Sequence, residues 1–444
     1  MNDVLLVNLP IQTHISQKLV GNYDFSPSIG LMYMQSFLTF NGFSCEIRDF
    51  AYDNISKNEF LQLISLYQPK VIGISAYTEN ISLAIKFSRI IKQYSPNILI
   101  VWGGVHVSLD LDEFISTESA DFAIVNEGES SIVELMTAIN SNETLLKYDD
   151  IEGLAFKRNG EFVKNQSRAY INDLDLLPLP SRDYFGLNRF SENKAIFVST
   201  SRGCPNNCIY CSAQALSGKM YRVRNIDNVF LEILMLQNEI GKISINIVDD
   251  SFTIMRKRVE RFLELIEEHH SDFRWICESI VKHMTEDLLV RMKNDNLLAI
   301  QYGMESGNQE TLNKINKGID LDYAMKIIDA THRLGIIPIL SFIFGHYCET
   351  AESARDTINF MKKAVSEYDA QVVASFNTPF PGTYQYIHKD ELGMTFISDD
   401  YRLYTLRNPI VETQNFSIDD QINWFYEVAN IQNKKGAVLN ERKD

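Results

Sequence analysis

The stretch "SRGCPNNCIYCSA", residues 201–213, holds Cys204, Cys208 and Cys211, three of the six cysteines in the 444-residue chain. It directly follows an apolar run near residues 195–200, so it is predicted to form a loop at the carboxyl end of a strand. Clustered thiols are more typical of metal binding than of a disulfide framework. Three thiolates can hold three irons of a 4Fe–4S cluster and leave the fourth iron open to a small ligand.

Zinc is the alternative metal for such a stretch. A structural zinc site needs four ligands, and the next Cys or His after Cys211 is His269. Zinc would therefore require a residue far away in the sequence, and an iron–sulfur cluster is the favoured interpretation. Cys45 lies in a strand-like stretch and Cys277 in "WICES", and both are interpreted as small buried hydrophobic residues.

Strand-like and helix-like segments alternate regularly after residue 195. The predicted strands cover about residues 195–200, 243–248, 273–277, 298–303, 337–344 and 370–376. The predicted helices cover about residues 226–240, 256–270, 285–294, 308–316, 320–335 and 352–366. These consecutive β/α units fit either a second open sheet or a partial barrel, and the periodicity alone does not distinguish the two.

The first 145 residues show an earlier alternation of the same kind. The predicted strands are 4–8, 44–50, 71–76, 98–104 and 122–128, and the predicted helices are about 29–41, 57–67, 80–94, 109–117 and 129–140. This pattern predicts an open parallel sheet of Rossmann-like type, in which ligands bind beyond the carboxyl ends of the strands. The side chains there are Asn8, Ser75, Gly103, Gly104, His106 and Glu127.

The glycine pair Gly103-Gly104 removes two side chains where a strand ends, which lets a large or phosphate-bearing ligand approach the backbone. His106 is interpreted either as a ligand or as a helix cap. No G-x-G-x-x-G follows the first strand, so an NAD-type pyrophosphate site is disfavoured.

These patterns divide the chain into four parts. An α/β domain over 1–145 is followed by a connector over 146–190, with a hairpin signal at Asn159-Gly160 and a proline-punctuated linker. The second α/β unit covers 191–385. The remaining residues 386–444 contain an amphipathic helix with Ser417 as its N-cap.

The composition argues against some partners. The formal charge of 42 − 58 = −16 disfavours binding to nucleic acid or to an anionic membrane. The apolar runs are too short for a membrane span, and the N-terminus "MNDVLLVNLP" lacks the basic region of a signal peptide. We therefore expect a cytoplasmic protein.

The cysteine spacing C-x3-C-x2-C, with Tyr210 before the last cysteine, resembles the radical S-adenosylmethionine (SAM) superfamily. Further motifs occur in the expected order at strand ends: "VDDSF" (248–252), "YGMESG" (302–307), "FIFGHYCET" (342–350) and "TPFPGT" (378–383). The first domain resembles the cobalamin-binding domain that precedes such barrels, through "VLLVNLP", "PSIGLMYM", "GISA", "WGGVHVS" and "DFAIVNEGES". The resemblance implies a Rossmann-like domain followed by a partial (β/α)6 barrel.

The resemblance also implies cofactors and their contacts. Cys204, Cys208 and Cys211 would bind the 4Fe–4S cluster, whose open iron is chelated by SAM. The implied SAM contacts are Tyr210, Asp249, Asp250, Glu305, Ser306 and Asn377, and the implied cobalamin contacts are the strand-end residues of the first domain given above. Cys348 and Glu278 are the candidate catalytic residues.

Two departures from the family pattern stand out. Tyr347-Cys348 replaces the Pro-Gly that relatives often carry before Glu-Thr, so Cys348 either fills space or faces the substrate. The D-x-H-x-x-G motif that supplies a histidine to cobalt in other cobalamin proteins is absent. That absence is common in this subgroup, so it decides nothing about cobalamin.

Three functions remain. The first is a cobalamin-dependent radical SAM methyltransferase acting on an unactivated carbon of a small molecule, with an electron donor such as flavodoxin or ferredoxin. The second is a radical SAM dehydratase, epimerase or other rearrangement enzyme whose first domain no longer binds cobalamin. The third, an iron–sulfur electron carrier or sensor, leaves the SAM-like strand ends unexplained.

Overall fold

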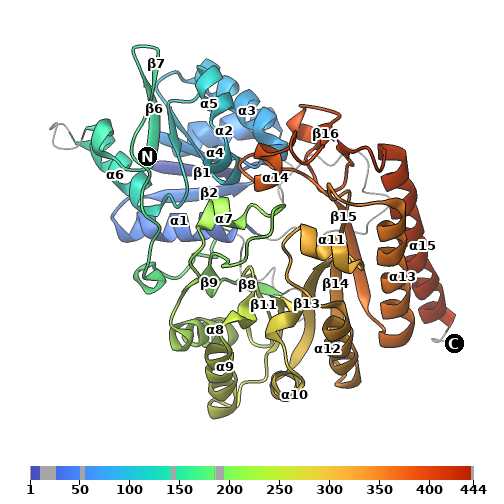
Figure 1. Cartoon of the computed structure of the whole chain (residues 1–444). Helices are drawn as coiled ribbons and strands as arrows, with labels where there is room; N and C mark the ends of the chain where they lie inside the picture. Colours follow the sequence, from blue (N-terminus) through green and yellow to red (C-terminus); the bar gives the residue numbers. More distant parts are fainter. Residues whose placement is uncertain are drawn as a thin grey trace.

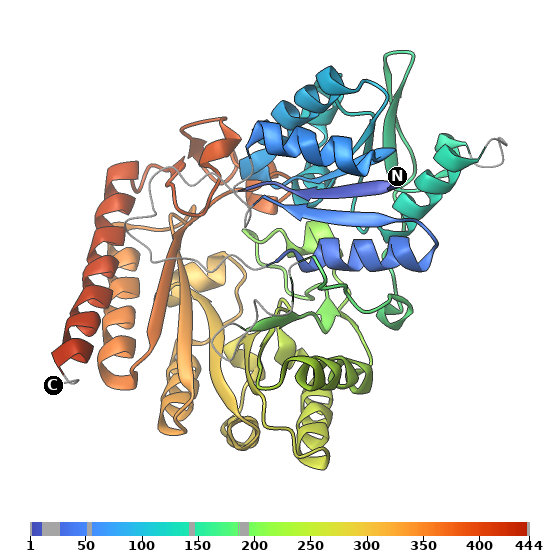
Figure 2. The ribbon, with the colours of Figure 1, turned by 180° about the vertical axis from the view of Figure 1, so that it is seen from behind.

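The computed structural model describes residues 2–10, 27–50, 56–141, 147–184, 186 and 195–441. Two parallel sheets, each covered by helices, lie next to each other (Figure 1). The view from behind shows the same arrangement, with the first domain above one side of the second sheet (Figure 2). Residues 185 and 187–194, where we expect the linker to end and the second unit to begin, lie outside the described residues.

The first sheet has the strand order β2-β1-β3-β4-β5-β6-β7. Its parallel strands are β1 (Val4–Asn8), β2 (Cys45–Asp49), β3 (Val71–Ser75), β4 (Leu99–Gly103) and β5 (Phe122–Ile124). The chain reverses its direction of winding between β1 and β3. In open α/β sheets the ligand crevice lies at such a switch point, beyond the carboxyl ends of the strands.

The connector hairpin belongs to this sheet. Strands β6 (Leu154–Arg158) and β7 (Glu161–Lys164) form the hairpin predicted around Asn159-Gly160, and β6 pairs antiparallel with β5. The first sheet therefore extends past residue 145, where we expect the domain to end. Backbone hydrogen bonding to β5 draws the hairpin into the sheet and covers an edge that would otherwise be unpaired.

Helices cover both faces of the first sheet. They are α1 (Ile29–Phe40), α2 (Lys57–Tyr67), α3 (Ile81–Tyr94), α4 (Val105–Leu109), α5 (Asp112–Ser116) and α6 (Glu129–Asn140). Their apolar sides form two separate cores, one on each face, which explains the near-continuous apolar strands. The helix predicted over 109–117 is two short helices, because the backbone is extended at Asp110.

The second sheet is a six-stranded, all-parallel partial barrel with the order β15-β14-β13-β12-β11-β8. Its strands are β8 (Ile196–Val198), β11 (Ser244–Ile247), β12 (Arg274–Ser279), β13 (Leu297–Glu305), β14 (Ile337–Phe344) and β15 (Gln371–Phe376). Between them run α8 (Ile226–Ile240), α9 (Arg256–Glu268), α10 (Glu286–Asn294), α11 (Gln309–Lys314), α12 (Leu321–Arg333) and α13 (Ala351–Tyr368). The predicted fold class is confirmed.

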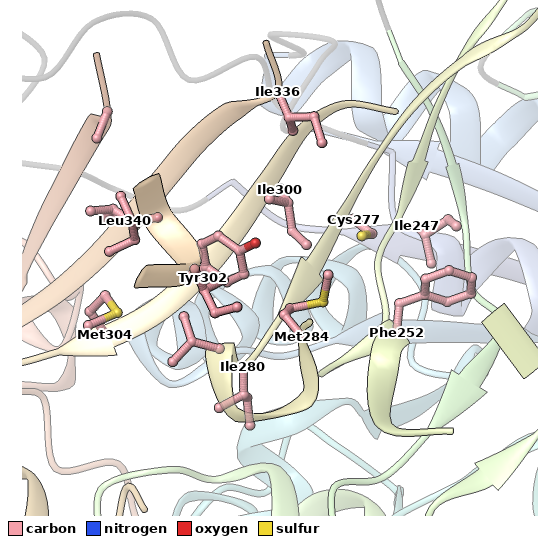
Figure 3. Close-up of a cluster of buried hydrophobic side chains, with 14 of the residues drawn as sticks. Ile247, Phe252, Cys277, Ile280, Met284, Ile300, Tyr302, Met304, Ile336 and Leu340 are labelled. Carbon is pink, nitrogen blue, oxygen red and sulfur yellow. The ribbon is translucent and has the colours of Figure 1, made fainter. Parts of the chain in front are cut away.

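Side chains on the outer face of these strands form the main core with the surrounding helices (Figure 3). Cys277 lies in this core next to Ile247 and Met284, and it is 2% exposed. Since side chains alternate across a strand, Ile276 and Glu278 face the opposite side, which is the lumen of the barrel.

The C-terminal residues close one side of the barrel. Helix α15 (Ile418–Glu441) packs on α13, and Ser417 caps its first turn through reciprocal hydrogen bonds with Asp420. The short helix α14 (Tyr384–Ile387) lies between the two domains (Figure 1). Within the described residues, no helix combines the length and apolar character needed to cross a membrane.

Candidate active site

The cysteine-bearing loop begins at a two-stranded ribbon at the barrel mouth. Strand β9 (Ser201–Arg202) pairs with β10 (Arg222–Val223), and Gly203 follows with a φ of +90°. A Cβ atom at Gly203 would lie 2.3 Å from the carbonyl oxygen of Met220, so only glycine fits there. The ribbon and this glycine direct the loop across the end of the barrel.

The three thiols of the loop suit an iron–sulfur cluster. Cys204 accepts a hydrogen bond from Asn206 Nδ2 at 3.2 Å, and Cys211 accepts one from the backbone N–H of Ala213 at 3.4 Å. Such bonds stabilise thiolate sulfur. No three His, Cys, Asp or Glu side chains converge closely enough for a single metal ion within the described part of the chain. Three thiols on one loop are a donor set that can hold three irons of a cluster, with one iron to each thiolate.

A buried lysine lies directly behind this loop. Lys317 Nζ is 2.7 Å from Glu305 Oε1 and 3.2 Å from the Tyr210 hydroxyl. Burial alone would lower the pKa of Lys317, but the charges of Glu305 and Cys208 outweigh it and the pKa is raised. Glu305 ends β13 with a φ of +68°, which turns its side chain toward the lysine. Tyr210, Glu305 and Lys317 thus form one connected group.

The two aspartates after β11 have different surroundings. Asp249 is buried and accepts hydrogen bonds from the backbone N–H groups of Thr200 and Ser201, at 2.6 and 3.0 Å. Its carboxylate fixes the start of β9 and is occupied by the protein. Asp250 keeps contact with solvent, and the partial desolvation of its carboxylate together with the charge of Asp249 raises its pKa. Of the expected pair, Asp249 is thus engaged by the backbone of Thr200 and Ser201, and Asp250 stays the candidate ligand contact.

Two further expected SAM contacts have structural partners instead. Ser306 is fully buried, lies 3.1 Å from the Thr357 hydroxyl and accepts a hydrogen bond from the Asn308 backbone. Asn377 exchanges two amide hydrogen bonds with Gln385, both at 2.9 Å, and also donates to the Gly345 carbonyl. The side chains of these two residues thus help to hold the barrel loops in place.

Glu278 faces the lumen between Asp250 and Glu305. Burial and the nearby charges of Asp250 and Glu305 raise its pKa to about 7. A carboxyl group with this pKa exchanges a proton near neutral pH. Cys348 lies partly buried at the rim beside Lys314, and burial raises its pKa to about 11, so its thiol is not activated as a nucleophile.

The first domain contains a cavity of about 640 Å³ at its switch point. Ser75, Gly103, Gly104 and Glu127 line it, as the strand-end pattern predicts. A Cβ atom at Gly103 would find only the Ile124 carbonyl oxygen within 4 Å, at 3.9 Å, so glycine keeps that wall open. Its lining of glycines and apolar side chains suits one face of a large ring system, as a cobalamin-type site requires.

His106 and Asn8, unlike the other strand-end residues, do not line this cavity. Both ring nitrogens of His106 are engaged, by Thr78 at 3.2 Å and Glu113 at 3.0 Å, and the residue is 1% exposed. Its ring is therefore held by side chains of the protein, and it does not line the cavity of the first domain.

Glu127 lines the cavity but also pairs with Arg202 and Arg222 of the barrel ribbon at 3.1 and 2.9 Å. It therefore joins the domains. Asn8 donates to Asp49 at 2.9 Å, and its buried Oδ1 lacks a partner among the described residues.

Lys317 is a residue of this candidate site that sequence reasoning missed. It follows α11 in a stretch, "NKINKG" (313–318), that looks like an ordinary solvated helix end. The one available signal is its position twelve residues after Glu305, with a tight turn at Gly318 that returns the chain to the barrel mouth.

Comparisons with known proteins agree with this geometry. The family model of the radical SAM superfamily matches residues 198–361, and that of the B12 binding domain matches residues 23–136. The chain is 29% identical over 420 residues to an uncharacterised methyltransferase of Pyrococcus horikoshii, covering 93% of this chain and 88% of that protein. It is 25% identical to the anaerobic magnesium-protoporphyrin IX monomethyl ester cyclase of Rubrivivax gelatinosus, covering 89% and 71% of the two chains.

Two solved structures superpose on most of this chain. The radical SAM methyltransferase TsrM of Kitasatospora setae, with cobalamin and a 4Fe–4S cluster bound, superposes with a TM-score of 0.72 at 17% identity, covering 90% of this chain and 81% of TsrM. The cobalamin-dependent radical SAM enzyme OxsB gives a TM-score of 0.74 at 17% identity, covering 95% and 65%. The chain therefore carries a B12-binding domain followed by a domain of the radical SAM superfamily.

Proposed function

We propose that the protein is a cobalamin-dependent radical SAM methyltransferase that acts on an unactivated carbon of a small molecule. One observation carries the proposal: the cavity of the first domain is lined from both sides. Gly103 and Gly104 contribute from the first domain, and Phe197, Ser199 and Arg202 contribute from the barrel. Arg202 directly precedes the cysteine loop. The pocket suited to cobalamin and the loop suited to the cluster therefore share a wall.

The bound cofactors supply a 5′-deoxyadenosyl radical, from SAM at the cluster, and a methyl group carried by cobalamin. The protein's own residues bind and orient them. Cys204, Cys208 and Cys211 hold the cluster. Tyr210 offers a flat face suited to the adenine of SAM.

Charged residues of the lumen match the charges of SAM. The ammonium of Lys317 suits the methionine carboxylate, and Asp250 suits the methionine amino group. Glu305, already oriented by Lys317 at 2.7 Å, is placed to accept from the ribose hydroxyls. In this proposal Lys317, Asp250 and Glu305 each contact a different group of SAM. Glu278 is then the carboxyl group left to contact the substrate.

Glu278 is proposed to hold or exchange a substrate proton. It faces the lumen from β12, and its raised pKa of about 7 lets it do so near neutral pH. A small molecule can enter the lumen and reach the Glu278 carboxyl there. The strong negative charge of the chain supports a partner other than nucleic acid.

The names of the relatives favour methyl transfer without deciding it. Relatives named as methyltransferases include the Pyrococcus horikoshii protein and the cytidylyl-2-hydroxyethylphosphonate methyltransferase of Streptomyces wedmorensis, which is 22% identical. The cyclase relatives favour the alternative, a radical SAM enzyme that rearranges or cyclises its substrate.

The two functions differ in what they make from SAM. Cluster-loaded protein is incubated anaerobically with hydroxocobalamin, an artificial reductant and SAM, and the products are quantified by mass spectrometry. Methyl transfer predicts S-adenosylhomocysteine and 5′-deoxyadenosine together, whereas rearrangement predicts 5′-deoxyadenosine alone. The Cys208→Ala variant is the control and should yield no 5′-deoxyadenosine. If the wild-type protein also yields none, the proposal fails.

A further inference from the structure

A buried row of three side chains lies behind the middle cysteine of the loop. In this row the ammonium of Lys317 contacts both Glu305, at 2.7 Å, and the hydroxyl of Tyr210, at 3.2 Å. The side chains of Lys317 and Glu305 are only 7% and 10% exposed. Tyr210 belongs to the cysteine loop itself. The positive member of this buried ion pair is therefore the one in contact with the loop.

The row continues to the sulfur of Cys208. An ammonium group can only donate, so Lys317 uses the Tyr210 oxygen as an acceptor and leaves the hydroxyl proton to hydrogen-bond with Cys208. Burial raises the pKa of the Cys208 thiol, whereas the charge of Lys317 and this hydrogen bond both lower it. Glu305 raises the same pKa, but by less than Lys317 lowers it. At Cys208 the lysine charge therefore outweighs the glutamate charge.

The other two cysteines have different surroundings. Cys204 accepts a hydrogen bond from the neutral amide of Asn206 at 3.2 Å, and Cys211 accepts one from a backbone N–H at 3.4 Å. Behind Asn206 lies Lys282, which donates to its Oδ1 at 2.7 Å but is exposed, so water and salt screen its charge. Cys208 is therefore the thiol on which a buried charge acts most directly.

We propose that Lys317, through Tyr210 and Cys208, raises the reduction potential of the cluster held by the loop, and that Glu305 lowers it. Reduction adds one electron, and hence one negative charge, to the cluster and its thiolates. A buried cation stabilises that added charge, and a buried carboxylate opposes it. A hydrogen bond to a ligand sulfur acts in the same direction as the cation. The row thus sets how readily the cluster accepts the electron that SAM cleavage requires. The inference rests on the proposed function, because it requires a 4Fe–4S cluster on the loop.

The test is a redox titration of the cluster-loaded protein with dithionite, followed by electron paramagnetic resonance, in the absence of SAM and cobalamin. Lys317→Met is expected to lower the equilibrium constant for one-electron reduction about tenfold, which corresponds to a potential about 59 mV lower. Glu305→Gln is expected to shift the potential in the opposite direction. Lys314→Met is the matched control, because Lys314 is an exposed lysine paired with Glu310 at 2.6 Å, and it should leave the potential unchanged.

Two further variants guard against a loss of folding. Lys317→Met/Glu305→Gln leaves no buried charge of the pair behind, and its potential is expected below that of the wild type, because the lysine has the larger effect. Tyr210→Phe keeps the aromatic ring and removes the hydroxyl. It is expected to lower the potential by less than Lys317→Met does, because the lysine charge remains.

The sign of each shift distinguishes this role from a structural one. A general disturbance of the loop would move the potentials of Lys317→Met and Glu305→Gln in the same direction, and that result would overturn the inference. Wild-type potentials in Lys317→Met and in the double variant would overturn it as well, and so would an equal shift in Lys314→Met. Each of these results would leave the proposed function intact. A wild-type protein that takes up no cluster would end both the inference and the proposed function.

Discussion

The guanidinium of Arg202 lies 2.7 Å from a carboxylate oxygen of Glu129, and this ion pair joins the two domains at their cofactor sites. Arg202 directly precedes the cysteine loop, and Glu129 begins α6 at the edge of the glycine-lined cavity. Glu127 pairs with Arg202 and with Arg222, so the ribbon β9–β10 is held to the first domain at several points. The spacing between the two sites is thereby fixed by partly buried charges.

Arg202→Met should lower the free energy of unfolding by about 2 kcal/mol, because Glu129 would keep its buried charge without a partner. Adding Glu129→Gln should recover part of that loss. Thermal unfolding of the single and double variants measures both effects. Arg256→Met, whose ion pairs are solvent-exposed, is the control and should change stability by less than about 0.5 kcal/mol. If the double variant is as unstable as Arg202→Met alone, the pairing of Arg202 with Glu129 is contradicted.

Gly104→Ala should impair cobalamin binding at least tenfold. Gly104 has a φ of +95°, and a Cβ atom there would lie 2.9 Å from the Ala76 carbonyl oxygen and 3.1 Å from the Ser75 hydroxyl, so the cavity wall must shift. Gly42→Ala is matched, because Gly42 also has a positive φ, +86°, but its Cβ would meet nothing within 4 Å. Equilibrium dialysis with hydroxocobalamin distinguishes the two, and equal retention by both variants would contradict this role of Gly104.

Lys317→Met should lower stability by about 3 kcal/mol and weaken SAM binding at least tenfold. The stability loss arises because Glu305 would be left as a buried, uncompensated carboxylate. The double variant Lys317→Met/Glu305→Gln should regain stability without regaining SAM affinity. Thermal unfolding and SAM binding to the cluster-loaded protein are the two measurements. Unchanged SAM affinity in both variants would remove Lys317 from the proposed contacts.

Glu349→Gln should flatten the pH dependence of stability. Glu349 is fully buried, and burial raises its pKa from 4.5 to about 8, although hydrogen bonds from the backbone of Gly345 and His346 partly oppose this. Since the unfolded chain releases this proton at lower pH, the wild-type protein loses stability as pH rises from about 4.5 to about 8. The glutamine variant lacks that loss, whereas exposed Glu352→Gln should follow the wild type. The midpoint of thermal unfolding is measured across this pH range for the wild type and both variants. Equal slopes of the midpoint against pH in all three proteins would contradict this role of Glu349.

Most of the fold could be predicted from the sequence because hydrophobic periodicity encodes it locally. The six barrel strands and the five parallel strands of the first sheet lie within a few residues of their predicted positions. The hairpin around Asn159-Gly160 was also readable from its turn residues. The hairpin continues the first sheet because β6 pairs with β5. No local sequence pattern predicts that pairing.

The site was less predictable, because motifs give residue types at strand ends but not the direction of each side chain. Asp249 and Asp250 are adjacent and chemically alike, yet only the tertiary contacts of Thr200 and Ser201 show that Asp249 is occupied. His106 likewise depends on Thr78 and Glu113 from other segments. Lys317 reaches the cysteine loop only through the folded turn after α11, so no spacing rule identifies it.

The most direct test of the central claim is the amount of cobalamin retained by the full-length protein after anaerobic cluster reconstitution, exposure to hydroxocobalamin and desalting. Absorbance spectroscopy gives cobalamin per chain, and iron analysis of the same sample shows that the cluster is present. The account predicts close to one cobalamin per chain. A protein that holds its cluster and cleaves SAM but retains no cobalamin would contradict it, and the first domain would then be a scaffold for a rearrangement enzyme.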